Sequence, residues 1–120
     1  MSITKIVDGL LTDLDVHHRE VVISPVLWRP DDNDETKRIY YFIVAVCKKG
    51  GDVFNAKIDT LGDRSDGIAA RSAVMTEMMT SKRHKPLLIH GVDDELAMVD
   101  LCCALWPSPQ TAEIRDLCQS

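Results

Sequence analysis

The stretch Ile39–Cys47 constrains the fold more than any other part of the chain, because it is apolar at odd and even positions alike. Its β-branched and aromatic residues favour a β-strand. A strand that is apolar on both faces needs cover on both faces, so we expect it at the centre of a sheet. A chain of 120 residues has little material to spare for this, and a second subunit would supply the missing cover.

The segments around this strand predict further helix and sheet. Glu20–Trp28 is expected to form a strand, and Pro25 predicts an edge position or a bulge because proline cannot donate to a ladder. Lys48–Gly51 predicts a hairpin turn, and Phe54–Asp59 alternates as a strand with one apolar face does. Ser2 is a good N-cap for an amphipathic helix whose apolar arc holds Ile3, Ile6, Val7, Leu10, Leu11 and Leu14.

The second half predicts a helix from about Asp66 to Ser81, a short buried strand at Pro86–His90 and a helix at Leu96–Trp106. Ser108 and Pro109 then open a last short helix that reaches about Cys118. We therefore predict one α+β domain over residues 1–120. Its order is helix–three antiparallel strands–helix–strand–helix–helix, with one four-stranded mixed sheet and the helices packed on it.

The charge balance limits the classes of partner. Fourteen Lys and Arg against nineteen Asp and Glu give a net charge of −5, which argues against general binding of nucleic acid or anionic membranes. No run approaches the roughly 20 apolar residues of a membrane span. Asp8 interrupts any signal-peptide core, so we expect a cytoplasmic protein with four reduced cysteines. No cysteine spacing predicts a metal site, and no cofactor is expected.

Known catalytic patterns match poorly. Gly62–Gly67 lacks the lysine of a phosphate loop, and Ser65 lacks the first glycine of a nucleophile elbow. The adjacent His17 and His18 are expected to finish the first helix rather than share a metal ion. The chain is therefore not expected to be an enzyme.

Over residues 3–90 the predicted order helix–three strands–helix–strand resembles the core of restriction-endonuclease-like nucleases. The resemblance implies an acid on the second strand and an acid-x-Lys pair on the third, which together hold a divalent metal. Here the third strand has Asn55-Ala56-Lys57, and Ile39–Cys47 has no acid. The resemblance therefore implies at most a degenerate fold without activity, because a divalent metal needs anionic oxygen ligands.

Three residues are candidates for a small-ligand pocket. His90 ends a strand before Gly91 and a helix, where crevices often form. Arg71 interrupts the apolar arc of one helix, and Asp100 is the lone polar residue between Leu96 and Trp106. Buried charges are costly unless they are paired. The alternatives are that Arg71 and Asp100 pair with each other, that they face a pocket or a subunit interface, or that Arg71 extends to solvent from an early helical turn.

The leading interpretation is a non-enzymatic protein-interaction module that acts as a homodimer. The helix Leu96–Trp106 is apolar nearly all round, so it favours cover by a second subunit, with Trp106 at a partner contact. One alternative is the small-ligand-binding protein, and another is an inhibitor or immunity-type protein. The last would meet a basic partner through an acidic loop formed by Asp31, Asp32, Asp34 and Glu35.

Overall fold

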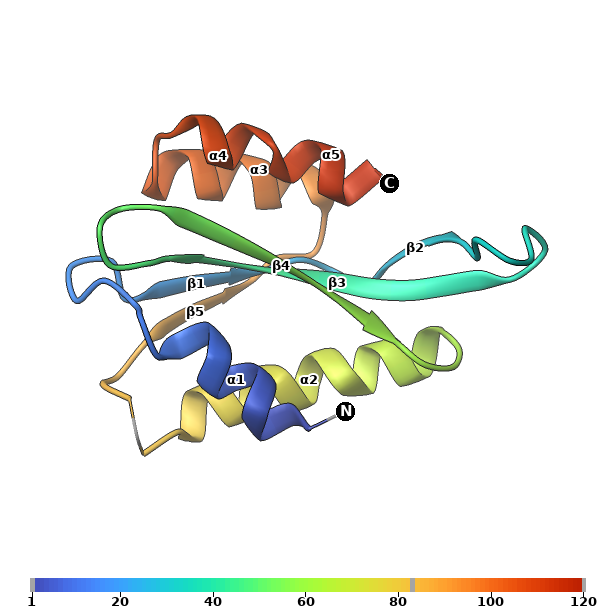
Figure 1. The fold of residues 1–120 in the computed structure, drawn as a ribbon, viewed down its shortest axis with the longest axis horizontal. Helices are drawn as coiled ribbons and strands as arrows, with labels where there is room; N and C mark the ends of the chain where they lie inside the picture. Colours follow the sequence, from blue (N-terminus) through green and yellow to red (C-terminus); the bar gives the residue numbers. More distant parts are fainter. Residues whose placement is uncertain (1, 83, 120) are drawn as a thin grey trace.

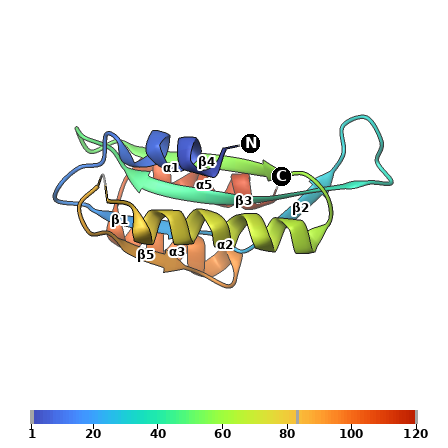
Figure 2. The same ribbon diagram turned by 90° about the horizontal axis from the view of Figure 1, so that it is seen from below.

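In the computed structural model, which describes residues 2–82 and 84–119, a mixed sheet lies between two layers of helices (Figures 1 and 2). Helices α1 and α2 cover one face, and α3, α4 and α5 cover the other. This architecture confirms the predicted α+β class, with five strands in place of four. The elements are α1 (Ile3–Leu11), β1 (Glu20–Ile23), β2 (Leu27–Pro30), β3 (Arg38–Cys47), β4 (Val53–Thr60), α2 (Arg64–Thr80), β5 (Leu88–Gly91), α3 (Glu95–Leu105), α4 (Pro109–Ala112) and α5 (Ile114–Gln119).

Strand β3 organises the sheet. β4 pairs with it antiparallel from Tyr40↔Thr60 to Cys47↔Val53. On its other side β3 pairs antiparallel with both β1 and β2, which share that side end to end. β5 pairs with β1 in parallel after the α2 crossover. β4 is therefore the outer strand on one side of β3, and β5 is the outer strand beyond β1 on the other side. β2 pairs with β3 alone among the described strands, so it is an outer strand as well.

The predicted strand Glu20–Trp28 is split into β1 and β2 by a bulge around Pro25, as one of the two sequence alternatives expected. Ser24 holds the bulge to β3. Its backbone N–H donates to the Ile43 carbonyl at 2.9 Å, and its hydroxyl oxygen accepts from the Ile43 N–H at 2.8 Å. The buried backbone of β3 thus stays hydrogen-bonded although Pro25 has no donor.

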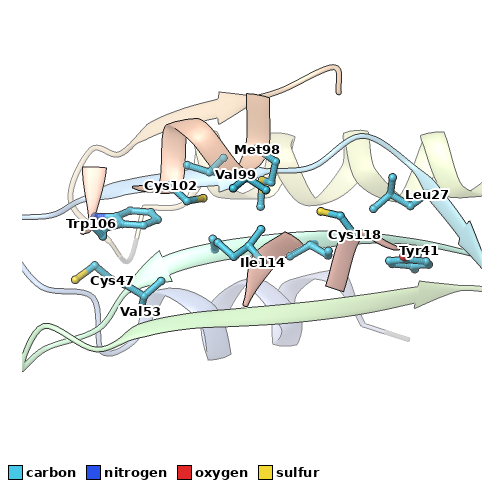
Figure 3. Packing of buried hydrophobic residues seen from close by; sticks show 13 residues of the cluster. Leu27, Tyr41, Cys47, Val53, Met98, Val99, Cys102, Trp106, Ile114 and Cys118 are labelled. Carbon is cyan, nitrogen blue, oxygen red and sulfur yellow. The ribbon is translucent and has the colours of Figure 1, made fainter. Parts of the chain in front are cut away.

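Both faces of β3 are buried within one chain. Tyr41, Ile43, Ala45 and Cys47 pack in a cluster with residues of α3 and α5, part of which Figure 3 shows. Phe42, Val44 and Val46 pack in the other cluster, with α1 and α2. The expectation that β3 needs a second subunit for cover was therefore wrong, because the helices are divided between the two faces.

Helix boundaries differ from the predictions where side chains cap the ends. α1 ends at Leu11, and Lys48 Nζ donates to the carbonyls of Gly9 and Leu10 at 3.2 and 2.9 Å. Because the helix ends there, His17 and His18 lie in the following loop and do not finish the helix. α2 begins at Arg64, two residues earlier than expected, because Asp63 is its N-cap in a capping box with Asp66.

Strand β5 and helix α3 are less covered than their sequences indicated. β5 was expected to be buried, but it is an edge strand in which Leu88 is 58% exposed. α3 buries Met98, Val99 and Cys102 and leaves Leu96 exposed. An apolar run therefore does not reveal which side of an element is covered. Within the described residues, no helix is long and apolar enough to cross a membrane.

Candidate functional site: the two sheet edges

Arg71 ties α2 to the sheet at the end of β5. Its Nε donates to the Ser24 carbonyl at 2.6 Å, and its Nη2 donates to the Val92 carbonyl at 3.3 Å. Burial lowers the pKa of Arg71, and Asp93 opposes this shift. A Cβ on Gly91 would lie 3.1 Å from Arg71 Nη2, so glycine there permits the close approach. The guanidinium therefore has a structural task.

His90 and Asp100 lie away from Arg71. His90 pairs in register with Val22, whose side chain belongs to the cluster under α3, so His90 is on the opposite face of the sheet from α2. Its Nε2 is 3.1 Å from Glu20 Oε1. Asp100 is exposed on α3. The structure does not bring the three predicted ligand residues together, and a sequence pattern cannot show which face each one occupies.

The acidic loop between β2 and β3 is organised by its own carboxylates. Asp31 and Asp34 accept backbone N–H groups two residues ahead, from Asn33 at 2.8 Å and from Thr36 at 3.0 Å. Hydrogen bonds from the Thr36 backbone and hydroxyl lower the pKa of Asp34. Asp32 lies 3.5 Å from Arg29 Nη1, and Glu35 is exposed. Much of the loop's charge is thus engaged locally.

Trp106 is a core residue. It is 4% exposed and packs in the cluster between the sheet and α3, α4 and α5 (Figure 3). The expectation of a partner contact at Trp106 was wrong, because the chain turns after α3 and places α4 and α5 beside it. The exposed tryptophan is Trp28, which stacks with the Arg38 guanidinium 4.0 Å from its ring centroid.

The strand residues that carry the nuclease resemblance are occupied by structural contacts. Asn55 Nδ2 lies 3.5 Å from the Gln110 carbonyl, and Lys57 Nζ lies 4.3 Å above the Tyr41 ring. Over residues 2–82 and 84–119, no group of three or more His, Cys, Asp or Glu residues is placed to hold a metal ion.

The free edge of β5 is a feature that the sequence predictions missed. The Leu88 N–H donates to the Arg19 carbonyl, and the Val92 N–H donates to the Ile23 carbonyl. Both hydrogen bonds are on the side of β5 that faces β1. Because successive strand residues direct their polar groups to alternate sides, the N–H and C=O groups of Ile89 and Gly91 point to the open edge. The edge therefore offers hydrogen-bonding groups beside the half-exposed side chain of Leu88.

Charges of opposite sign flank this edge strand. The exposed lysines Lys82 and Lys85 precede it, and the exposed acids Asp93, Asp94 and Glu95 follow it. Asp94 is occupied as the N-cap of α3, where its side chain accepts from the Ala97 N–H. The charge order along the chain was visible in the sequence, but its position beside an open edge was not.

The cysteines are free thiols with different surroundings. Burial raises the pKa of Cys102 to about 12 and that of Cys118 to about 11. Cys103 is exposed on α3. The buried thiols behave as small apolar side chains.

Comparisons with protein-family models, with curated proteins and with solved structures find no match to this chain. The case for a function therefore depends on the surfaces of the molecule itself.

Proposed function

We propose that this protein is a non-enzymatic protein-interaction module that acts in the cytoplasm as a homodimer. The observation that carries the proposal is the β5 edge, where no described strand pairs with the outward ladder groups and a basic and an acidic segment lie on either side. Such an edge is a template for pairing with another strand. The four free thiols fit a reducing compartment.

A two-fold axis through β5 would satisfy both the backbone and the charges. In an antiparallel pair centred on Ile89, Lys85 of one copy lies opposite Asp93 of the second copy. Centring the pair on His90 instead brings Lys85 toward the acidic segment that leads into α3. In either register the contact occurs twice, because an interface of this symmetry repeats each contact. Opposite charges at the facing ends of the two strands favour the pairing, while like charges disfavour it.

The side chain of Leu88 adds an apolar contact to this pairing. It is 58% exposed in the single chain, and cross-strand neighbours on the same face lie close enough to bury it. Burial of most of a leucine side chain stabilises an interface by roughly 1–2 kcal/mol. The dimer is therefore expected to combine main-chain hydrogen bonds, one apolar contact and paired charges.

Charge reversal at one end of the strand tests the proposal. In size-exclusion chromatography with light scattering, the wild type at micromolar concentration is expected at twice its chain mass of 13.4 kDa. The variant Lys82→Glu/Lys85→Glu places acid against acid and is expected to run as a monomer. A matched control, Lys37→Glu/Lys49→Glu, changes the same charge in two exposed turns and is expected to remain a dimer. A monomeric wild type would refute the proposal.

A further inference from the structure

The side of helix α2 that faces β5 ends in an exposed methionine. Arg71 on this side donates to the Val92 carbonyl at 3.3 Å. One turn later, a Cβ placed on Gly91 would come within 2.9 Å of Met75 Cε. Met79 follows after one more turn, on the same side of the helix. Its side chain is 71% exposed, whereas that of Met75 is partly buried.

The spacing of helix and strand places Met79 level with Ile89. α2 runs antiparallel to β5, since later residues of the helix lie beside earlier residues of the strand. One helical turn advances about 5.4 Å, which corresponds to about one and a half strand residues. Counted back from Gly91, this distance brings Met79 beside Ile89, whose side chain packs on the α2 face of the sheet. Ile89 is the centre of one of the two possible dimer registers, so in that register Met79 lies next to the two-fold axis.

The outer surface of α2 around Met79 is uncharged. The exposed residues in the second half of the helix are Ser72, Ala73, Thr76, Met79 and Thr80. The Thr80 hydroxyl already donates to the Thr76 carbonyl at 2.8 Å, so burial would leave this donor satisfied. Glu77 is turned toward α1, where the Thr4 hydroxyl donates to it at 3.3 Å. Interface cores are depleted of charge and enriched in methionine, and this surface has that composition.

A pair of β5 strands is too small to form a stable interface alone. Such an interface buries roughly 800 Å² on each partner, and β5 has four residues. A β5 dimer therefore needs further contact on a face of the sheet. On the other face, α3 begins with Glu95 and carries the exposed Asp100, which would repel the same acids of a second copy. Strand β4 lies beside the carboxylates of Glu113 and Asp116. The uncharged surface of α2 is continuous with the β5 edge.

We propose that Met75 and Met79 of α2 pack against the same two residues of a second copy, beside the paired β5 strands. The inference rests on the proposed β5 dimer and adds the contact area that a strand pair lacks. It also selects the register centred on Ile89, because Met79 then meets its own copy across the axis. Unbranched, polarisable methionine side chains adapt readily to such a contact.

A charge at the axis tests the contact. Met79→Glu brings two carboxylates together and is expected to raise the dimer dissociation constant at least about tenfold, measured by sedimentation. Met79→Leu keeps an apolar contact and is expected to change the constant less than about threefold. The matched control Leu61→Glu introduces the same charge in the β4–α2 loop, where Leu61 is 94% exposed, and is expected to change it less than about twofold.

A second measurement uses the wild-type chain. Hydrogen peroxide transfers one oxygen atom to an exposed thioether sulfur, which gives the sulfoxide and water. At concentrations where the dimer predominates, Met79 is expected to be oxidised at least about threefold more slowly than in the monomeric variant Lys82→Glu/Lys85→Glu, because only the free monomer exposes it. Mass spectrometry measures both rates. Met98, which is fully buried in one chain, reacts slowly in both proteins and is the internal reference.

The outcomes separate this contact from the β5 dimer itself. The α2 contact is overturned, and the β5 pairing stands, if Lys82→Glu/Lys85→Glu dissociates the dimer while Met79→Glu has no effect and Met79 is oxidised as fast as in the monomer. Equal weakening by Met79→Glu and Leu61→Glu would also overturn the α2 contact. A monomeric wild type would overturn both proposals.

Discussion

Two outer strands of this sheet, β4 and β5, leave their open sides in different surroundings. β4 is a long edge, and Gln110 from α4 accepts its first outward N–H. β5 is a short edge, and the segment before it is basic while the segment after it is acidic. An edge with opposite charges at its ends complements a copy of itself, whereas an edge beside carboxylates alone does not. By length alone, the longer strand β4 would have been the better candidate for pairing between two copies.

The largest predicted effect concerns what holds β5 in place. Arg71→Met removes the donors to the Ser24 and Val92 carbonyls and should lower the free energy of unfolding by roughly 2–4 kcal/mol, measured by urea denaturation. The control Arg64→Met alters an exposed arginine at the start of the same helix and should cost less than about 0.5 kcal/mol. Equal losses for the two variants would show that Arg71 does not fix this edge.

The next effect concerns the apolar contact proposed at β5. Leu88→Arg buries a charge against the second copy and should raise the dimer dissociation constant at least about tenfold, measured by sedimentation. Leu61→Arg is the matched control, because Leu61 is 94% exposed in the β4–α2 loop. If both substitutions weaken the dimer equally, the contact is not at β5.

A smaller effect is expected at β4. Gln110→Ala removes the acceptor of the Val53 N–H and should cost about 1 kcal/mol. Hydrogen exchange should then accelerate at Val53 and remain unchanged at Val46 in the buried strand β3. Unchanged exchange at Val53 would mean that Gln110 does not protect this edge, and the contrast with β5 would disappear.

The smallest effect is a difference in thiol reactivity between the exposed side and the buried side of α3, the helix after β5. At pH 8 iodoacetamide should modify Cys103 and spare Cys102 and Cys118, whose raised pKa values keep them protonated. Mass spectrometry of the alkylated protein identifies the site. Rapid labelling of Cys102 in the folded protein would contradict this packing.

Because the pKa values of Cys102 and Cys118 lie above the ordinary value of 9, the free energy of unfolding should fall as the pH rises from about 9 toward 11–12.

The sequence predicted the elements better than their surroundings. Ser2, Pro25 and the apolar stretch of β3 act locally, through capping, loss of a donor and burial on both faces, so their roles could be inferred from the residues alone. Helix α3 has almost no polar face to orient it. Its sequence therefore did not show that Trp106 would be buried while Asp100 was exposed.

The candidate surfaces were harder to predict because they depend on sheet order. Lys85 and Asp93 stand on either side of an apolar run that is equally compatible with a buried strand. Only the parallel pairing of β5 with β1, at the end of the sheet, places these charges beside an open edge. Likewise, Met79 belongs to an apolar arc in the sequence, and only the position of α2 beside β5 leaves it exposed at this edge.

The central claim is a two-fold interface at β5 with exchanged charges, and it is tested most directly by mixing two charge variants. Lys82→Glu/Lys85→Glu makes the ends of β5 acidic, and Asp93→Lys/Glu95→Lys makes them basic while Asp94 still caps α3. Each variant alone should sediment as a monomer, because its own copies repel. An equimolar mixture should sediment as a heterodimer, since both contacts then join opposite charges. Two variants that each still form dimers, or a mixture that stays monomeric, would contradict the account.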